Sequence, residues 1–567
     1  MLVLLGVMQA AAIIEGFGIS LILPIIQGDQ ENNSRLSNII NWGFDLVSVT
    51  PDITAILIAL IIFFILRAGL LIGQSWYQAR ILSHHLIEMR SEFIKTVSKT
   101  DYQYLNSQDS GVLSNVMSGE ITRVNSALAQ LLNLMVRATT AIVYIALALL
   151  VAPVVTIFLC VLAFPVLVLM LYLNRITTRA SLQQTDGSNR QQSFFLEAIR
   201  NIKHLKATGR DAIVIRRVLL EVKRVGDSFR KLTFLQGATN AGLEPIIVIV
   251  LASVIYFFTE IRGADVLEIL FLLFVFRTAA VNMVATQPAY RKFISAAGSM
   301  KAYGEFRANI LANREKDTSD NPSPVIGHGF EMREVSYTYP GQKSPALNNI
   351  SALIPSNSTV AFVGMSGSGK TTAANIIASL LKPSSGLVYV GGTPYESINI
   401  NQLRRKIGYV TQESVVFNAS LEDNITLWDG EPNSQKISDV VSKIGINKMI
   451  RTNPNNETLG DAGTSLSGGE RQRLAIAREL YWDTDILILD EATSSIDSVL
   501  EKQISQIIDS QRGTKTIIVI AHRLATIQNA DLIFVFNGGN IVESGTFNEL
   551  ADGDGLFSNM VKMQSLQ

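Results

Sequence analysis

The sequence has one cysteine, few charged residues and no excess of charge of either sign. A single cysteine in 567 residues excludes a disulfide framework and any metal or iron–sulfur site built from several cysteines. Lys and Arg together number 48, as do Asp and Glu. This balance argues against a nucleic-acid partner, because nucleic-acid-binding modules usually carry a basic excess. Charged residues make up 17% of the chain and hydrophobic residues 48%, which excludes intrinsic disorder and indicates that part of the chain lies in lipid.

Long apolar runs are concentrated in the first half of the chain, before about residue 290. We count six candidate membrane spans there, and each is long enough, at ~1.5 Å per residue, to cross a ~30 Å hydrocarbon core. They cover about residues 1–26, 53–78, 127–151, 153–175, 236–259 and 265–288. The first span lacks a basic start and is too long for the apolar part of a cleaved signal peptide.

The charges between the spans predict their orientation. Segment 27–52 carries one Arg against four acidic residues, whereas segment 176–235 is rich in Lys and Arg. By the positive-inside rule, segment 176–235 is cytoplasmic. Both this segment and residues 79–125 show helical apolar spacing, so we expect helices that extend the spans beyond the bilayer. The tips of these extensions would lie near residues 100–105 and 206–211.

A polar, proline-containing run at residues 313–324 separates the apolar half from a soluble half. Such a composition is typical of a linker. We therefore predict an all-α, six-helix transmembrane domain at residues 1–312, a linker at 313–328 and an α/β P-loop NTPase domain at 329–567.

The strongest chemical motif is Gly364-Met-Ser-Gly-Ser-Gly-Lys370-Thr371, between an apolar strand at 361–363 and a helical stretch. It matches the P-loop pattern G-x-x-x-x-G-K-[ST] in the strand–loop–helix setting that the pattern requires. Its glycines let successive backbone N–H groups turn toward phosphates, and the following helix adds its N-terminal dipole. Lys370 can reach the β- and γ-phosphates of ATP, and the Thr371 hydroxyl can bind Mg²⁺.

An acidic pair follows the apolar strand at residues 486–489. Asp490 is placed to hold Mg²⁺, directly or through water, and Glu491 to accept a proton from the water that attacks the γ-phosphate. An acidic pair after a strand can also be a surface turn, but the P-loop upstream favours the catalytic interpretation.

Between these motifs lies Leu466-Ser-Gly-Gly-Glu470, and the three together resemble the ATP-binding cassette (ABC) ATPases over the whole soluble half. The resemblance implies that Tyr339 stacks on adenine, that Gln412 senses Mg²⁺ and the membrane domain, and that His522 contacts the γ-phosphate. Asp497 would belong to the D-loop. The implied nucleotide-binding residues are Tyr339, Gly364, Ser366, Gly367, Ser368, Gly369, Lys370, Thr371, Thr372, Ser467, Gly468, Gly469 and Asp497. Catalysis would rest on Glu491, His522 and Gln412, and Mg²⁺ binding on Thr371, Gln412 and Asp490.

The signature residues Ser467, Gly468 and Gly469 stand at a predicted helix start, which is a second anion site. In the ABC family this site binds the nucleotide held by the P-loop of the opposite domain. The chain has one such domain, so the resemblance implies a homodimer that uses ATP and Mg²⁺, with a heterodimer left open.

Six spans followed by one cassette resemble an ABC exporter half-transporter. In that family the two cytoplasmic tips become coupling helices. The segment before the signature departs from the family pattern Gly-Glu-Arg-Gly, because Asp461 and Ala462 stand at its centre. The resemblance then implies that a basic contact to the coupling helices is lost or replaced.

Three arginines, Arg67, Arg137 and Arg277, fall inside predicted spans. Ionisable residues are costly in lipid and normally face a bundle interior or a water-filled cavity. Because arginine binds phosphate bidentately, these three predict a chamber for an anionic, phosphorylated amphiphile. The alternative is that they pair with Glu15 and Glu244 or reach toward an interface.

The run from Glu15 to Pro24 resembles the lipid-linked oligosaccharide flippases of bacterial protein glycosylation. The predicted function is therefore ATP-driven flipping of a lipid-linked oligosaccharide by alternating access. The protein would be located in the bacterial cytoplasmic membrane, with its ATP-binding domain in the cytoplasm. A multidrug or lipid A exporter is the alternative among transporters. An ATP-gated channel or regulator is an alternative of another class, against which Glu491 and His522 argue.

Overall fold

The structure is a computed structural model, and it describes residues 2–21, 44–45, 52–151, 153–261, 266–446, 458–459, 466–490, 506, 509–521 and 527–564. It divides into two compact units. The first comprises Met1–Ser98 and Gln108–Ala312, and the second comprises Lys99–Ser107 and Asn313–Gln567. The range 1–312 predicted for the first domain therefore contains a short segment, residues 99–107, that packs with the second unit.

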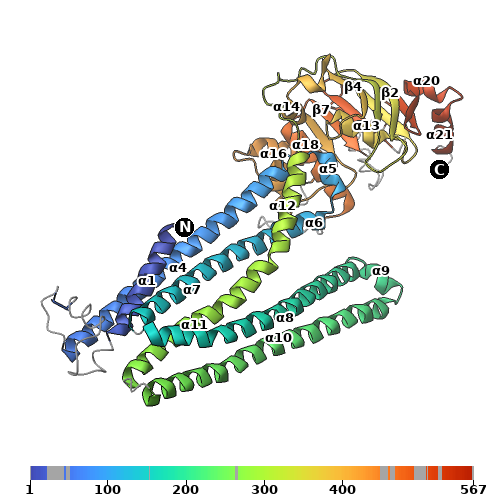
Figure 1. The fold of residues 1–567 in the computed structure, drawn as a ribbon. Coiled ribbons are helices and arrows are strands. Elements are labelled where there is room, and N and C mark those ends of the chain that lie inside the picture. The colour runs from blue at the N-terminus through green and yellow to red at the C-terminus, as the bar shows by residue number, and fades with distance from the viewer. Residues whose placement is uncertain are drawn as a thin grey trace. The chain divides into compact units, whose positions relative to one another are not determined.

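The first unit is helical (Figure 1). Each of the six predicted spans overlaps one long helix, and the spans predicted at 1–26, 236–259 and 265–288 extend beyond the helix that they overlap. These helices are α1 (Leu2–Ser20), α4 (Ile53–Val97), α7 (Ile121–Val151), α8 (Pro153–Arg200), α10 (Asp211–Tyr256) and α11 (Val266–Ser295). Between and after them lie α6 (Ser110–Asn115), the π-helix η1 (Val116–Glu120), α9 (Ile202–Ala207), the π-helix η2 (Phe257–Ile261) and α12 (Ala297–Ala312).

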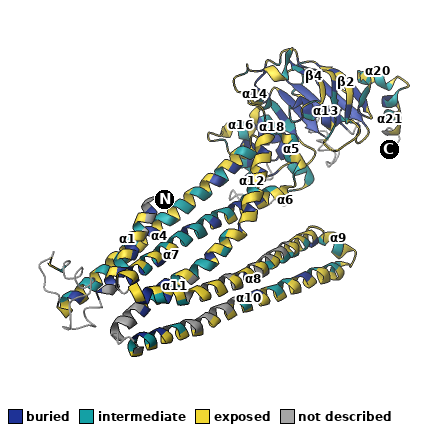
Figure 2. Ribbon diagram, viewed as in Figure 1, coloured by how far each residue is buried: buried dark blue, intermediate teal, exposed yellow. Residues whose placement is uncertain are grey.

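Two helical stretches among the described residues, Ile53–Val97 and Ser110–Leu150, are long and apolar enough to cross a membrane. Much of the first stretch is exposed (Figure 2), and its exposed residues include Ile58, Ile65 and Ile72. An outward apolar surface is costly in water and favourable in lipid. The structure therefore has the kind of helix surface that a membrane domain requires.

Three helices are far longer than a bilayer needs. Helices α4, α8 and α10 have 45, 48 and 46 residues, which at ~1.5 Å per residue is ~70 Å, about twice the hydrocarbon thickness. Helix α8 ends just before α9, and α10 begins just after it, with a left-handed Gly209 between α9 and α10. The end of α9 and the start of α10 fall at the tip predicted near residues 206–211.

The helices of the first unit are held together by small and aromatic side chains. Tyr144 and Ala148 of α7 share one buried cluster with Val254 of α10 and Val275 of α11. At another position, helices α4 and α12 pair through a stack of Phe93 on Phe306, whose ring centroids lie 5.8 Å apart.

The second unit contains two sheets. The six-stranded sheet has the order β10-β9-β3-β8-β7-β6, and the four-stranded antiparallel sheet has the order β2-β1-β4-β5. The strands are β1 (Phe330–Tyr337), β2 (Leu347–Ile354), β3 (Thr359–Gly364), β4 (Ser385–Val390), β5 (Thr393–Pro394), β6 (Ile407–Val410), β7 (Ile486–Asp490), β8 (Thr516–Ile520), β9 (Leu532–Asn537) and β10 (Asn540–Gly545). The helices are α5 (Tyr102–Ser107), α13 (Lys370–Ile377), the 3-10 helix η3 (Tyr395–Ser397), α14 (Ile400–Arg405), α15 (Leu421–Thr426), α16 (Ser434–Ile444), α18 (Gly468–Trp482), α20 (Phe547–Ala551) and α21 (Leu556–Gln564).

The central strands β3, β7 and β8 are buried along their whole length. Alternate side chains of a strand point to opposite faces of the sheet. Accordingly, Ala361 and Val363 belong to one hydrophobic core, whereas Val360 and Phe362 belong to another. Strands β3, β8 and β7 run parallel, so their carboxyl ends meet at one edge of the sheet. In α/β proteins this edge is where ligands bind.

Candidate nucleotide-binding site

The loop after strand β3 has a backbone that only glycine adopts easily. Gly364, Gly367 and Gly369 have φ angles of 151°, 76° and 106°. A Cβ atom at Gly364 would lie 2.2 Å from the carbonyl oxygen of Phe536, and one at Gly369 would lie 2.6 Å from that of Ala346. The loop therefore passes too close to neighbouring backbone for any side chain at these two positions. Its glycines are required by space as well as by conformation.

Lys370 is the first residue of helix α13 and is only 5% exposed. Its ammonium donates hydrogen bonds to the carbonyl oxygens of Gly364, at 2.9 Å, and Met365, at 2.8 Å. The Ser368 hydroxyl lies 3.4 Å from the same nitrogen. A buried ammonium is costly unless it is bonded, and here the P-loop bends around it. The fold thus concentrates one positive charge inside the loop that is predicted to receive the phosphates.

Thr371, in the first turn of α13, and Asp490, the last residue of β7, meet at this edge. The Thr371 hydroxyl donates a hydrogen bond to the Asp490 carboxylate, with 3.3 Å between the oxygens. Asp490 is buried at the end of β7. Magnesium prefers hard oxygen ligands and is usually held by one or two carboxylates together with substrate phosphates. A hydroxyl beside a buried carboxylate fits that ion. Gln412, the third predicted magnesium residue, lies exposed two residues after β6.

Tyr339 is half-buried beside the start of the P-loop helix. Its hydroxyl is 3.1 Å from the hydroxyl of Thr372, in the first turn of α13. Its ring meets Tyr337 edge to face, with the ring centroids 4.9 Å apart. The structure therefore places the aromatic residue predicted to contact adenine next to the predicted phosphate loop.

The signature residues form the start of α18, a helix of 15 residues. The exposed Ser467 is its N-cap, and the Glu470 carboxylate accepts a hydrogen bond from the Ser467 N–H at 2.8 Å. This capping box holds the pKa of Glu470 below its usual range, because the backbone and hydroxyl of Ser467 donate to the carboxylate. Gly468 and Gly469 occupy the first two helical positions, whose N–H groups have no partner within a helix. The local geometry suits a second anion site.

Several predicted residues lie outside the described part of the chain. They are Glu491, Asp497 and His522, together with Asp461 and Ala462 before the signature. The described chain ends at Asp490 immediately before Glu491, and at Ala521 immediately before His522.

Arg478 is a buried residue near the site that sequence patterns did not predict. It lies on the signature helix and donates hydrogen bonds to the carbonyl oxygens of Asn424, at 2.8 Å, and Val415, at 3.1 Å. Burial lowers the pKa of its guanidinium. Val415 is three residues beyond Gln412, so Arg478 joins the signature helix to the loop that carries Gln412. An arginine inside the apolar run Leu-Ala-Ile-Ala-Arg-Glu-Leu was the available signal, and it did not indicate a partner.

The neighbouring Glu479 predicts a pH-dependent stability. Burial raises the pKa of its carboxyl to about 7, although the positive charge of Arg478 acts to lower this pKa. Between pH ~4.5 and ~7 the folded state keeps a proton that the unfolded state has lost, so stability falls as pH rises through this range. We expect Glu479→Gln to be more stable than the wild type at pH 8, by up to ~3 kcal/mol, and nearly equal at pH 5. Thermal unfolding of both proteins at the two pH values measures this.

The exposed Glu396 provides the control, since Glu396→Gln is expected to leave the pH dependence unchanged. If the difference in stability between Glu479→Gln and the wild type stayed constant from pH 5 to pH 8, the raised pKa of Glu479 would be contradicted.

Comparisons with known proteins follow the two units. Residues 2–275 match the family model described as ABC transporter transmembrane region, and residues 347–494 match the model described as ABC transporter. These matches confirm the predicted order of a helical transmembrane domain and an α/β ATP-binding domain.

Curated relatives match over part of their length. An ATP-dependent lipid A-core flippase of Saccharophagus degradans is 40% identical over 236 residues, which cover 41% of this chain and 40% of that protein. The protein of the same description from Escherichia coli K12 is 39% identical over 258 residues, covering 45% of this chain and 44% of that protein. ATP-binding cassette sub-family B member 5 of Mus musculus is 39% identical over 276 residues, covering 48% of this chain and 22% of that protein. The chain thus spans less than half the length of the curated relatives that it matches.

One solved structure, that of a bacterial Atm1-family ABC exporter with ATP bound, is similar over 99% of this chain and 98% of its own. The TM-score is 0.76 and the sequence identity 20%. This similarity shows that the fold is shared.

Proposed function

Because this chain belongs to the ABC transporters, we propose that it couples ATP hydrolysis to the movement of an anionic, lipid-like substrate across a membrane. The observation that carries the proposal is the buried Lys370 ammonium inside a glycine loop, at the same sheet edge as the Thr371–Asp490 pair. A cation and a hard-oxygen pair at the carboxyl ends of parallel strands form a site for a magnesium–triphosphate.

The residues at this edge have separable roles in the proposal. Lys370 and the loop N–H groups bind and orient the phosphates. Thr371 and Asp490 would hold Mg²⁺, which when bound supplies positive charge against the phosphate oxygens. Glu491 takes the proton of the attacking water, while Gln412 and His522 orient the reacting groups. Tyr339 receives the base.

We propose that the working molecule is a homodimer. The signature start at Ser467 is an anion site separate from the P-loop, so a second copy can supply the nucleotide that it binds. A feature of the first unit supports this. The parts of α8 and α10 outside the predicted spans expose large apolar side chains, which lipid would not cover at that level. These include Phe195, Ile199, Ile213, Leu219, Phe229 and Phe234.

The substrate proposal rests on the arginines of the membrane domain. The structure pairs Arg67 with Glu15, at 2.6 Å, so the charge of Arg67 is already balanced. Arg137 is half-buried on α7 and Arg277 is exposed on α11, two helices that pack against each other. The Glu244 side chain lies outside what the structure describes. Arg137 and Arg277 are therefore the stronger candidates for binding a phosphate.

A lipid-linked oligosaccharide remains the proposed substrate, on the resemblance of residues 15–24. Lipid A is the second candidate, since two of the relatives above are described as lipid A-core flippases. Both are phosphorylated lipids, so the same arginines suit either. The proposed location is the bacterial cytoplasmic membrane, with the ATP-binding domain in the cytoplasm.

Reconstitution into liposomes tests this proposal. We expect a polyprenyl-pyrophosphate oligosaccharide to be translocated in an ATP-dependent manner and to stimulate ATPase activity. We expect Arg137→Gln and Arg277→Gln each to lower translocation about tenfold or more, since a charge-assisted hydrogen bond is worth roughly 1.5–3 kcal/mol. The corresponding Lys variants should retain part of the activity, because they keep the charge and lose the bidentate geometry.

Arg230→Gln is the matched control, because Arg230 is an exposed arginine of the same unit, paired with Asp227. Translocation of lipid A in place of the oligosaccharide would select the second candidate. Full translocation by the double variant Arg137→Gln/Arg277→Gln would remove the arginines from the proposal. ATP-dependent ion conductance without lipid movement would indicate a channel instead.

A further inference from the structure

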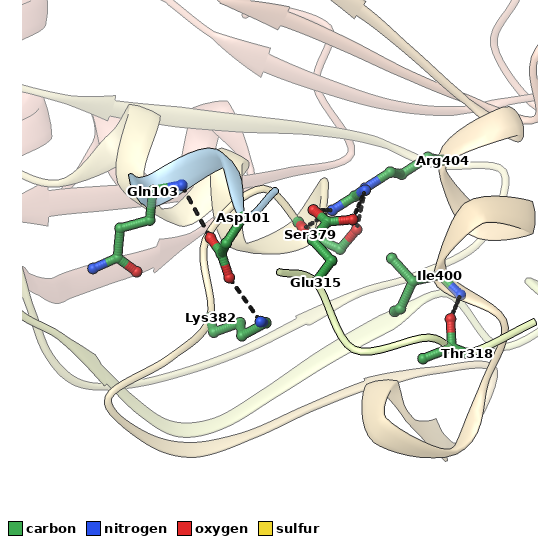
Figure 3. Close-up of polar contacts among 8 residues, drawn as sticks. All are labelled: Asp101, Gln103, Glu315, Thr318, Ser379, Lys382, Ile400 and Arg404. Atoms are coloured by element: carbon green, nitrogen blue, oxygen red, sulfur yellow. Dashed lines mark hydrogen bonds and ion pairs between the residues drawn. The ribbon is translucent and has the colours of Figure 1, made fainter. Parts of the chain in front are cut away.

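The linker after α12 is bound to the ATP-binding core by an arginine that also holds the end of the P-loop helix. Arg404, on α14, donates two hydrogen bonds to the carboxylate of Glu315, at 2.8 and 2.9 Å. The same guanidinium donates to the carbonyl oxygen of Ser379, at 2.8 Å, and to its hydroxyl, at 3.2 Å (Figure 3). One side chain therefore joins the linker to Ser379, two residues after the end of helix α13.

Ser379 stands where the P-loop helix ends. Helix α13 runs from Lys370 to Ile377, and Ser379 has a left-handed φ of 55°. A non-glycine residue in this conformation costs free energy and persists where its surroundings hold it. Here Arg404 bonds both polar oxygens of Ser379. The helix thus carries the predicted phosphate ligands at one end and a fixed attachment at the other.

A second contact reaches the same loop. Lys382, three residues beyond Ser379, donates to the carboxylate of Asp101 at 2.7 Å (Figure 3). Thr100 pairs with Arg314 in an antiparallel bridge, and the Asp101 N–H donates to the Asn313 carbonyl at 2.9 Å. The segment after α4 and the linker after α12 are therefore joined to each other and to the loop at residues 378–382.

The linker has further anchors on the start of α14. The buried Thr318 hydroxyl accepts a hydrogen bond from the Ile400 N–H at 3.1 Å (Figure 3). The Asn399 side chain donates to the Ser319 carbonyl at 3.1 Å. These contacts hold residues 313–319 as an ordered strap on the second unit, although their composition predicted a linker.

The two helices that lead into these segments are also joined within the first unit. Arg307 of α12 donates to the Glu92 carboxylate of α4, at 3.1 Å from its Nε. Phe93 and Phe306 stack beside this pair. The ends of α4 and α12 are therefore joined to each other, and both continue within a few residues into the segments bound near Ser379.

From these contacts we infer that Glu315 and Arg404 are positioning residues that transmit the nucleotide state of the P-loop helix to the linker and α12. A movement of α13 on binding or losing the γ-phosphate displaces Ser379, and Arg404 passes that displacement to Glu315. The Arg404–Glu315 pair suits this role better than Lys382–Asp101. The side chains of Arg404 and Glu315 are 29% and 25% exposed, and two hydrogen bonds join them. The Lys382 side chain is 64% exposed and forms one hydrogen bond with Asp101. Exposed ion pairs with a single hydrogen bond contribute little to stability. The inference rests on ATP binding by the P-loop and not on the identity of the substrate.

The test uses the full-length protein in liposomes with Cys160 replaced by Ser and one spin label per chain. One set of variants carries the label at Val281→Cys on α11 and a second set at Val542→Cys on β10; both residues are exposed. Distances between the labels of the two copies are measured without nucleotide and with ATP, Mg²⁺ and vanadate. We expect Glu315→Gln to leave ATPase activity and the Val542 response intact. The Val281 response is the change in the ratio of short to long distances between the Val281 labels when ATP, Mg²⁺ and vanadate are added. In Glu315→Gln we expect the ratio reached with nucleotide to differ from the wild-type ratio by about 2- to 30-fold.

Two variants separate transmission from a structural defect. Glu315→Asp keeps a carboxylate for Arg404 and leaves the Arg404–Ser379 hydrogen bonds in place, so it is expected to retain part of the Val281 response. Glu331→Gln breaks a comparable bidentate pair with Arg333 on β1 and is expected to behave as the wild type. A wild-type Val281 response in Glu315→Gln would overturn the inference. So would loss of both responses in Glu315→Gln and in Glu315→Asp alike. Absence of ATPase activity in the wild type would instead refute the proposed function.

Discussion

Replacing Glu491 with Gln is expected to lower ATP hydrolysis by about 10²- to 10⁴-fold, the usual contribution of a positioned general base. ATP binding is expected to persist, because Lys370, Thr371 and Asp490 are unchanged and hold the phosphates and the metal. With binding intact and hydrolysis blocked, the two ATP-binding domains should accumulate in the closed dimer. Steady-state ATPase assays and cross-linking of the two domains in the presence of ATP measure both effects.

Glu431 serves as the control for this substitution. It is an exposed glutamate of the same unit, and Glu431→Gln is expected to hydrolyse ATP at the wild-type rate. Wild-type turnover in Glu491→Gln would show that another residue is the base. A strong loss of ATP binding in that variant would show that Glu491 acts mainly in binding.

Replacing Lys370 with Ala is expected to weaken ATP binding by roughly 10- to 100-fold, since a hydrogen bond from a charged group is worth about 1.5–3 kcal/mol. The structure adds a second cost. The carbonyl oxygens of Gly364 and Met365 would lose the ammonium to which they are bonded, so the loop itself should become less ordered. Equilibrium binding of a fluorescent ATP analogue measures the affinity, and hydrogen exchange of the loop amides measures the order.

Lys343→Ala provides the comparison, because Lys343 is an exposed lysine in the connection between β1 and β2. It is expected to bind ATP as the wild type does. If Lys370→Ala bound and hydrolysed ATP normally, the buried ammonium would serve the loop alone, and the nucleotide site would have to be placed elsewhere.

The predicted nucleotide site followed from local sequence because its parts are local. The P-loop needs glycines at positions whose φ angles are positive, and neighbouring residues decide that conformation. The capping box of Ser467 and Glu470 spans three residues. The apolar runs of β3 and β7 predicted two strands. In the structure these strands run parallel, each paired with β8, and this brings Thr371 and Asp490 to one edge although they are 119 residues apart.

Contacts that join distant segments were not predictable in this way. Arg404 and Glu315 are 89 residues apart, and Lys382 and Asp101 are 281 apart. No periodicity or motif links such positions, because each side chain satisfies its own local pattern equally well with or without the partner. For Arg67, the sequence left a substrate phosphate and the carboxylate of Glu15 as alternatives, and the folded chain brings Glu15 within 2.6 Å.

The amino-acid sequence by itself determined the division into an apolar and a soluble half, the helical spans and the chemistry of the P-loop. Hydrophobic periodicity and glycine conformation act over a few residues, so they can be read along the chain. Only the tertiary structure decided that residues 99–107 and the linker bind the end of the P-loop helix. It also showed that Arg478 connects the signature helix to the Gln412 loop, and it placed Glu479 where burial raises the pKa of its carboxyl. Those properties depend on burial and on partners that are brought together by folding, and both arise from the packing of segments that are far apart in the chain.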